Sequence, residues 1–172
     1  MLDAGVHPVA FLQDLLGEVS EVYAQVLDRN PLIGGPDSLL MQMRLGNGIV
    51  GQYFACYTAK VAQETLLGLT VYGSAGTLVV STGKVCWTQG AGKPAGVFRV
   101  PGTDRGYQRQ WENFANAIQG KEPLLSTLHS AYRDLLVIDA ALRSAATGRK
   151  MALPSELARK EKDETQIFDT RP

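Results

Sequence analysis

The sequence predicts an α+β fold, a mostly antiparallel sheet with helices packed on one face. Strand-like runs fill the middle of the chain, between about residues 19 and 100, and helical patterns stand at both ends. Most links between the strand-like runs are short, which favours antiparallel neighbours because a parallel pair needs a crossover of a dozen or more residues. A block of strands with helices outside it is typical of the α+β class.

Composition indicates one ordinary globular domain and excludes several classes of partner. The chain has 172 residues, of which 45% are hydrophobic and 20% are charged. It carries 17 basic and 17 acidic residues, so bulk charge gives no attraction to nucleic acid or to an anionic membrane. We find no run that would span a bilayer and no signal peptide, and therefore expect a cytoplasmic protein. We expect a domain over residues 1–153 and a charged, solvated tail over residues 154–172.

The first stretch, residues 3–17, has the pattern of a short amphipathic helix. Its predicted apolar stripe consists of Val9, Leu12, Leu15 and Leu16. Gly17 is a natural stop for this helix. Pro8 leaves two starts open, because proline suits a first turn but clashes in a helix interior. Either the helix starts at Pro8, or it begins near Leu2 and bends.

Alternating apolar and polar residues predict the strands. We expect strands at residues 19–27, 38–45, 49–59, 67–72, 77–81, 84–88, 97–100 and a short one at 150–153. Residues 30–37 and 89–96 are rich in Gly and Pro, and we expect both to be loops. Cys56 and Cys86 lie in apolar runs without metal-type spacing, so reduced core thiols are expected.

Two longer helices are expected after residue 106. Trp111, Phe114 and Ile118 recur at helical spacing, and Gly120 ends that helix. The second helix runs from about residue 128 to 147, capped by Ser126 or Thr127. Its predicted buried stripe is Ala131, Leu135, Ile138, Leu142 and Ala145.

One glycine pattern imitates a cofactor motif. Residues 46–51, Gly-Asn-Gly-Ile-Val-Gly, fit the G-x-G-x-x-G pattern of dinucleotide-binding proteins. That motif needs a strand before it and a helix after it, so that the phosphate meets helical N–H groups. Here a β-rich run follows Gly51, so we interpret the pattern as a hairpin turn and expect no cofactor-binding residue there.

Asp3 and His7 form the only closely spaced acid and imidazole pair in the chain. On a helix this spacing puts both side chains on one face. A carboxylate beside an imidazole orients the ring and stabilises its protonated form, as a general acid/base requires. A surface pair that only stabilises the helix is the plainer alternative. A metal site would need more ligands than these two, and the only other histidine, His129, lies on another expected helix.

The same stretch resembles the opening of the C-terminal domain of the Gfo/Idh/MocA family of NAD(P)-dependent oxidoreductases of sugars, cyclitols and related polyols. The motifs that carry the resemblance are Asp-Ala-Gly-Val-His at residues 3–7, Asn-Pro-Leu-Ile-Gly-Gly-Pro-Asp at 30–37, Leu-Thr-Val-Tyr-Gly-Ser-Ala-Gly-Thr-Leu at 69–78 and residues 107–120. It extends over about residues 2–153. It implies a large, open, twisted sheet whose helix-free face is used for subunit contact. It also implies that Asp3 and His7 line the active site, with His7 taking the proton of the hydroxyl being oxidised and Asp3 holding the imidazole.

The resemblance has a gap, which limits the expected activity. The family's catalytic lysine, in a Glu-Lys-Pro motif, belongs to a Rossmann domain that this sequence lacks. We therefore expect NAD or NADP to be used by a complete enzyme and neither to bind this chain, which should be inactive alone. Arg105 and Tyr107, just before a helix, are candidate substrate contacts because hydroxyl-rich ligands favour such donors. A helix-entry loop with a buried Tyr ring is the plainer alternative.

Two functions follow as hypotheses. The first is the substrate-binding and subunit-contact domain of an oxidoreductase that transfers hydride between NAD(P) and a sugar, cyclitol or related polyol. The second is a stand-alone oligomerising or ligand-binding module without catalysis. In both we expect a homodimer or a higher homo-oligomer through the sheet, because the strands carry apolar residues on both faces and the helices cover only one. Leu39 and Leu40 fall on opposite faces of one strand, and Tyr53 and Phe54 fall on opposite faces of the next.

Overall fold

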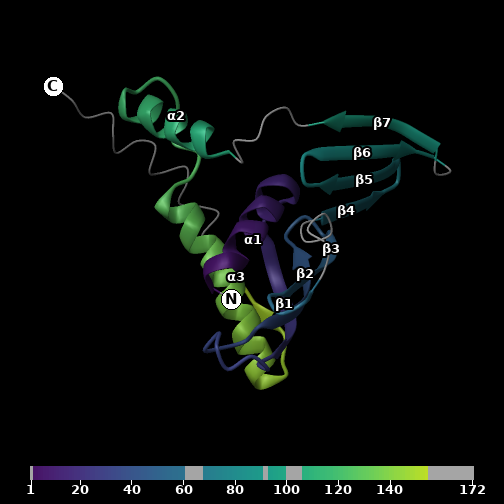
Figure 1. The fold of residues 1–172 in the computed structure, drawn as a ribbon, viewed down its shortest axis with the longest axis vertical. Helices are drawn as coiled ribbons and strands as arrows, with labels where there is room; N and C mark the ends of the chain where they lie inside the picture. The colour runs from purple at the N-terminus through teal and green to yellow at the C-terminus, as the bar shows by residue number, and fades with distance from the viewer. Residues whose placement is uncertain (1, 61–67, 91–92, 100–105, 155–172) are drawn as a thin grey trace. The chain divides into compact units, whose positions relative to one another are not determined.

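The computed structural model describes residues 2–60, 68–90, 93–99 and 106–154 of the chain (Figure 1). The chain divides into two compact units, one of Met1–Thr58 with Leu125–Pro172 and one of Ala59–Leu124. Helices and antiparallel strands make up both units, which confirms the α+β class. The strands form two four-stranded sheets, one in each unit. The expected tail lies outside the described residues from residue 155 onward.

The first unit contains a sheet with the order β3-β2-β1-β8. Its strands are β1 (Val19–Leu27), β2 (Ser38–Leu45), β3 (Val50–Cys56) and β8 (Met151–Ala152). Helix α3 (Leu128–Thr147) packs against β1, and helix α1 (Leu2–Leu16) packs against α3. The third expected strand is thus shorter than predicted, since it ends at Cys56.

The core of this unit lies between the sheet and the two helices. In β2 every second side chain, from Leu39 to Leu45, is buried, which confirms the alternation expected from sequence. The register places Met43 opposite Val22 and Met41 opposite Ala24, so the buried faces of β1 and β2 coincide. The buried apolar residues are Val9, Val19, Val22, Ala24, Leu39, Met41, Met43, Leu45, Val137, Ile138, Ala140 and Ala141.

The buried face of α3 differs from the predicted stripe. Ala131 is exposed and Leu135 is 42% exposed, although both were expected in the core. Asp134 and Ser144 are buried instead, at 7% and 0% exposed. Both make hydrogen bonds to the first part of the chain, and those bonds offset the cost of burying a polar group. The core face of α3 is therefore rotated toward two polar residues that apolar periodicity does not count.

Local chemistry sets the ends of α3. Thr127 Oγ1 accepts from the Ser130 N–H at 3.0 Å, and the Ser130 hydroxyl oxygen accepts from the Thr127 N–H at 3.0 Å. This capping box satisfies two N-terminal donors and confirms Thr127 as the cap. Gly148 ends the helix with φ of 66°, a left-handed conformation that favours glycine, and its N–H donates to the Ser144 carbonyl.

Ser144 also serves the sheet. Its hydroxyl accepts from the Ala24 N–H of β1 at 3.0 Å and donates to the Arg149 carbonyl at 2.6 Å. The two-residue strand β8 pairs only with Glu21 and Val22 of β1. Beyond the residues paired with β8, the next bond at this edge of β1 is therefore made by Ser144 of α3 to the Ala24 N–H.

Helix α1 starts at Leu2, so the second of the two expected starts is the observed one. Pro8 lies inside the helix. The helix stops at Gly17 as predicted, where φ is 105° and the Gly17 N–H donates to the Gln13 carbonyl at 2.9 Å. The side chain of Asn47, in the turn between β2 and β3, donates to the last helical carbonyl, that of Leu16, at 2.7 Å.

The loop between β1 and β2 is organised by one buried carboxylate. Asp37, 1% exposed, accepts from the Arg29 and Asn30 N–H groups, each at 2.8 Å, and from the Ser38 hydroxyl at 2.7 Å. The hydrogen bond from Ser38, and then that from the Arg29 amide, holds the pKa of Asp37 below its ordinary value. The first residues of this loop are thus bound to the carboxylate of its last residue, Asp37.

The second unit contains a meander in the order β4-β5-β6-β7. Its elements are β4 (Gly68–Gly73), β5 (Gly76–Ser81), β6 (Lys84–Gln89), β7 (Lys93–Arg99) and helix α2 (Tyr107–Ile118). The prediction that residues 89–96 form a loop is wrong at Gln89, which ends β6, and from Lys93 onward, where β7 begins. Gly96 pairs with Trp87, and a Cβ at Gly96 would overlap the indole ring. Glycine stands here because a larger residue would collide with the Trp87 ring of the neighbouring strand, and not because the chain forms a loop.

Candidate active site

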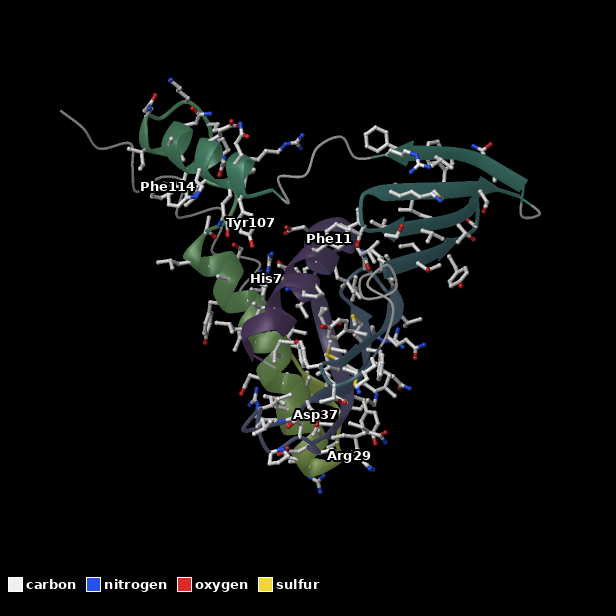
Figure 2. The ribbon with its side chains drawn as sticks, viewed as in Figure 1. His7, Phe11, Arg29, Asp37, Tyr107 and Phe114 are labelled. Atoms are coloured by element: carbon white, nitrogen blue, oxygen red, sulfur yellow. The ribbon has the colours of Figure 1, made fainter. Side chains whose placement is uncertain are left out.

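The predicted acid and imidazole pair lies on the first helix. Asp3 and His7 both fall within α1, four residues apart, which is the spacing of neighbours on one helical face. The His7 side chain is exposed (Figure 2). For Asp3 the helical backbone is described and its side chain is not, so contact between the two groups stays a prediction.

The opposite face of α1 is anchored in the core. Val9 and Gln13 are 3% and 4% exposed, while Phe11 and Leu15 are 48% and 46% exposed. The prediction that Leu15 belongs to the buried stripe is therefore wrong, and Gln13 occupies a buried place instead. His7, Phe11 and Leu15 recur at intervals of four and are all exposed, so they form the outward stripe of the helix.

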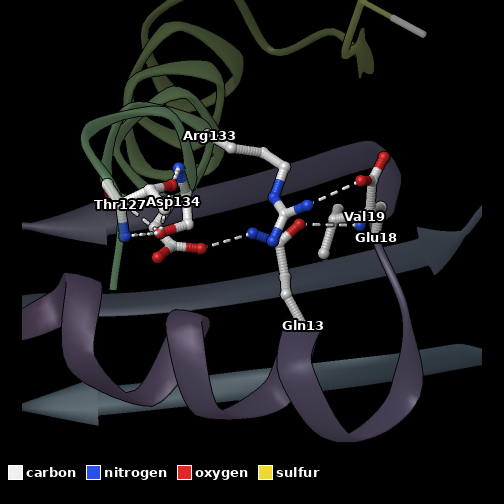
Figure 3. A network of polar contacts seen from close by, with 7 residues as sticks. Gln13, Glu18, Val19, Thr127, Arg133 and Asp134 are labelled. Atoms are coloured by element: carbon white, nitrogen blue, oxygen red, sulfur yellow. Dashed lines mark hydrogen bonds and ion pairs between the residues drawn. The ribbon is translucent and has the colours of Figure 1, made fainter. Parts of the chain in front are cut away.

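Gln13 joins three elements through two hydrogen bonds (Figure 3). Its amide nitrogen donates to Asp134 Oδ1 of α3 at 2.6 Å, and its amide oxygen accepts from the Val19 N–H of β1 at 2.9 Å. All three residues are buried. The amide satisfies a carboxylate on one side and a main-chain donor on the other, so the rotation of α1 against α3 and β1 is fixed by directional bonds.

Burial changes the acidity of Asp134. Removal from water raises its pKa, while the hydrogen bond from Gln13 and the charge of Arg133 act in the opposite direction. Arg133 itself pairs with Glu18, just after α1, at 2.7 Å between Nη1 and Oε1. The Nε of Arg133 is buried and finds no partner among the described residues. Two consecutive residues of α3 thus hold the end of α1 and the start of β1.

Sequence reasoning missed Gln13 and Asp134 as supports of this helix. A signal for Gln13 was present, because it follows Val9 by four residues and stands between Leu12 and Leu16 on an otherwise apolar stripe. A polar side chain in such a place is expected to have a buried partner. No local pattern identifies that partner, since Asp134 is 121 positions away.

The other two predicted site residues, Arg105 and Tyr107, lie outside the unit that carries His7. Tyr107 is the first residue of α2, in the second unit, and its side chain is 67% exposed. Arg105 lies outside the described residues. Both remain substrate-contact candidates on sequence grounds alone.

The fold decides one alternative reading of the sequence, the glycine pattern that imitates a cofactor motif. The glycine pattern at residues 46–51 forms the turn between β2 and β3 and the start of β3, closed by the Leu45 N–H donating to the Ile49 carbonyl at 2.8 Å. It leads into a strand and not into a helix, which confirms the hairpin reading. Within the described ranges no three His, Cys, Asp or Glu side chains gather as a metal site would require, and none of the helices there is long and apolar enough to cross a membrane. Cys56 and Cys86 are half-buried and form no disulfide.

Most of the chain matches one known protein family. Residues 1–153 match the family described as "Oxidoreductase family, C-terminal alpha/beta domain", known as Gfo/Idh/MocA. The chain belongs to this family. An uncharacterized protein of Saccharomyces cerevisiae is 28% identical over 156 residues, which cover 84% of this chain and 45% of that protein.

Solved oxidoreductase structures have the same fold over the residues that they share with this chain. An oxidoreductase from Thermotoga maritima is 30% identical with a TM-score of 0.75, over 87% of this chain and 43% of its own. A levoglucosan dehydrogenase in complex with NADH and levoglucosan is 20% identical with a TM-score of 0.75, over 89% of this chain and 50% of its own. The chain thus spans about half the length of these relatives.

Proposed function

We propose that this chain is the substrate-facing and subunit-contact domain of an oxidoreductase that transfers hydride between NAD(P) and a sugar, cyclitol or related polyol. One observation carries the proposal. The family match covers residues 1–153, and it includes a helix that presents His7 outward while Gln13 fixes the opposite face. The levoglucosan dehydrogenase complex, with NADH and a sugar derivative bound, supports the class of reaction.

The proposed chemistry assigns one task to each residue of the pair. Oxidation of an alcohol removes a proton from the hydroxyl and a hydride from its carbon, and the dinucleotide accepts the hydride. His7 takes the hydroxyl proton, as a base near neutral pH is suited to do. Asp3, one turn earlier on α1, holds the imidazole in the tautomer that accepts this proton and contacts the substrate.

The test is the loss of the imidazole in the complete oxidoreductase that carries this domain. His7→Ala should lower kcat by about 10²-fold or more, the usual contribution of a positioned acid or base. His129→Ala is the matched control, because His129 is the only other histidine and lies in the same unit. Asp3→Asn should also lower kcat while leaving the unfolding transition in place. Wild-type turnover in both His7→Ala and Asp3→Asn would contradict the proposal.

Dinucleotide binding by the isolated chain is a second test of the proposal. We propose that residues outside this domain hold the dinucleotide, because the only phosphate-type glycine pattern noted in the sequence forms a hairpin. Titration calorimetry with NAD and NADP should therefore show no appreciable binding. A micromolar dissociation constant for either dinucleotide would overturn this part of the proposal.

Subunit contact is proposed through the outer face of the first sheet. Leu40 and Phe54 are paired neighbours on that face and are 41% and 67% exposed, and Val50 on the same face is 66% exposed. Exposed apolar groups of this size favour association, although Gln42 and Gln52 lie between them. Sedimentation should report a dimer or larger assembly, and Phe54→Lys should shift it toward the monomer mass of 18.6 kDa.

The stand-alone binding module remains the second candidate function, and the same experiments separate the two. Leu32→Lys, at a loop position that is 93% exposed, is the control for the sedimentation test. A dimer lost in Phe54→Lys but retained in Leu32→Lys supports the sheet contact in either case. Only the response of kcat to His7→Ala distinguishes a catalytic domain from a module without catalysis.

A further inference from the structure

We propose that Phe11 is a specificity-determining residue that forms an apolar platform beside His7 for the carbon face of a ring-shaped substrate. The substrate class is accordingly a cyclic polyol or a pyranose, and open-chain polyols are the disfavoured class. This inference rests on the proposed function, because it takes His7 as the group that meets the reacting hydroxyl.

The placement of Phe11 follows from the helix. It is four residues after His7 in α1, so the two side chains are neighbours on one face, with the ring about 6 Å further along the axis at about 1.5 Å per residue. Figure 2 shows both side chains on the same helix. Both are in the first unit, and both are exposed.

The burial pattern argues against an ordinary core role. Residues 9 and 13, on either side of Phe11, are 3% and 4% exposed and anchor the helix. Phe11 is 48% exposed, which leaves nearly half of a large apolar ring uncovered in this chain. Because Gln13 fixes the rotation of α1 by two hydrogen bonds, this ring is held on the side that carries His7.

The chemistry of the ring selects its ligand. Phenylalanine has no polar handle, so it offers a hydroxyl-rich molecule neither donor nor acceptor. A pyranose or cyclitol, however, carries a face of C–H groups, and covering it with an aromatic ring removes apolar surface from water. A rigid ring keeps this C–H face beside the reacting carbon at no further cost in entropy. A flexible open-chain polyol must lose rotational freedom to present the same face.

The stripe also limits the size of the platform. The next residue along this stripe is Leu15, eight residues after His7. At a rise of about 1.5 Å per residue, Leu15 lies about 12 Å from His7 along the helix axis. A single six-membered ring whose hydroxyl is at His7 therefore covers Phe11 and does not reach Leu15. Leu15, 46% exposed, is a control on the same helix face with a comparable exposed fraction.

The experiment compares ring and open-chain probes in the complete oxidoreductase. The probes are myo-inositol and glucose as ring substrates and sorbitol as the open-chain counterpart. Phe11→Ala should raise KM for the better ring substrate by about tenfold, with kcat within about threefold of wild type. Phe11→Tyr should restore KM, Phe11→Leu should be intermediate, and Leu15→Ala should leave KM unchanged.

Each outcome decides the inference separately from the proposed function. An unchanged KM in Phe11→Ala, an equal rise in KM for ring and open-chain probes, or a fall in kcat without a change in KM would overturn it. Turnover of sorbitol but of neither ring, with kcat still dependent on His7, would overturn the inference and leave the proposed function standing. Turnover independent of His7 would instead remove the proposed function.

Discussion

Replacing Gln13 by leucine removes two buried hydrogen bonds without removing volume. Asp134 Oδ1 loses its 2.6 Å donor and the Val19 N–H loses its 2.9 Å acceptor, and these residues are 7% and 5% exposed. A buried polar group left without a partner costs about 1–3 kcal/mol, and a charged group costs more. The two orphans together amount to about 2–6 kcal/mol, and the added apolar surface of leucine returns about 1–2 kcal/mol of this. The expected loss of unfolding free energy is therefore about 1–4 kcal/mol.

The assay is urea unfolding of the chain at pH 7, followed by circular dichroism. Gln25→Leu, the same change at an exposed position of β1, should alter the unfolding free energy by less than about 0.5 kcal/mol. A double-mutant cycle with Asp134→Leu should give a coupling of about 1–3 kcal/mol, because the second change removes the orphaned carboxylate. A loss below about 1 kcal/mol in Gln13→Leu, or no coupling to Asp134, would refute the inference that this amide anchors α1.

Three further outcomes are expected from buried polar groups in the first unit. Ser144→Ala should lower the unfolding free energy by about 2–3 kcal/mol in the same urea assay, because the Ala24 N–H and the Arg149 carbonyl both lose their partner. Asp134 has a raised pKa, so its stabilising protonated form is complete below its ordinary pKa of 3.8 and is lost as pH rises through the folded value. The stability of wild type relative to Asp134→Asn should therefore fall as pH rises above about 4, and a flat difference would contradict this. Asp37 has a lowered pKa, so its contribution is present above 3.8 and is lost as pH falls through the folded value; Asp37→Asn should remove this loss of stability in acid.

The parts of the fold that follow from sequence are those in which one buried face dictates the pattern. Leu39 to Leu45 alternate because one side of β2 lies on the core, and a shift by one residue would turn every apolar side chain to water. The start of α3 was also predictable, since Thr127 and Ser130 form a local cap. In both cases the deciding interaction is local or repeats along one element.

Errors arose where a distant partner or a special fit decides the structure. The buried stripe of α3 was misplaced because Ser144 and Asp134 look like surface residues until Ala24 and Gln13, at least 120 positions away, are brought beside them. The start of β7 was misplaced because Gly96 signals a loop in sequence but makes room for the Trp87 ring in the sheet.

The candidate site was predictable to a similar degree. The spacing of Asp3 and His7 gives one helical face from sequence alone, and the structure adds that the face is outward at His7. The partner of Gln13 and the exposure of Phe11 could not be inferred, since both depend on how α1 is rotated against α3. That rotation is set by tertiary hydrogen bonds that local periodicity does not encode.

The hydroxyl of Ser144 has a consequence for how this protein meets other chains. The edge of a sheet is a template for main-chain pairing, and intermolecular strand addition is a common route to aggregation. Beyond the two residues of β8, the Ala24 amide of β1 is already engaged by a helix side chain. A foreign strand could not pair at this amide without first displacing the end of α3. At the opposite margin β3 is the last strand in the order, and we expect strand recruitment on this sheet to occur there.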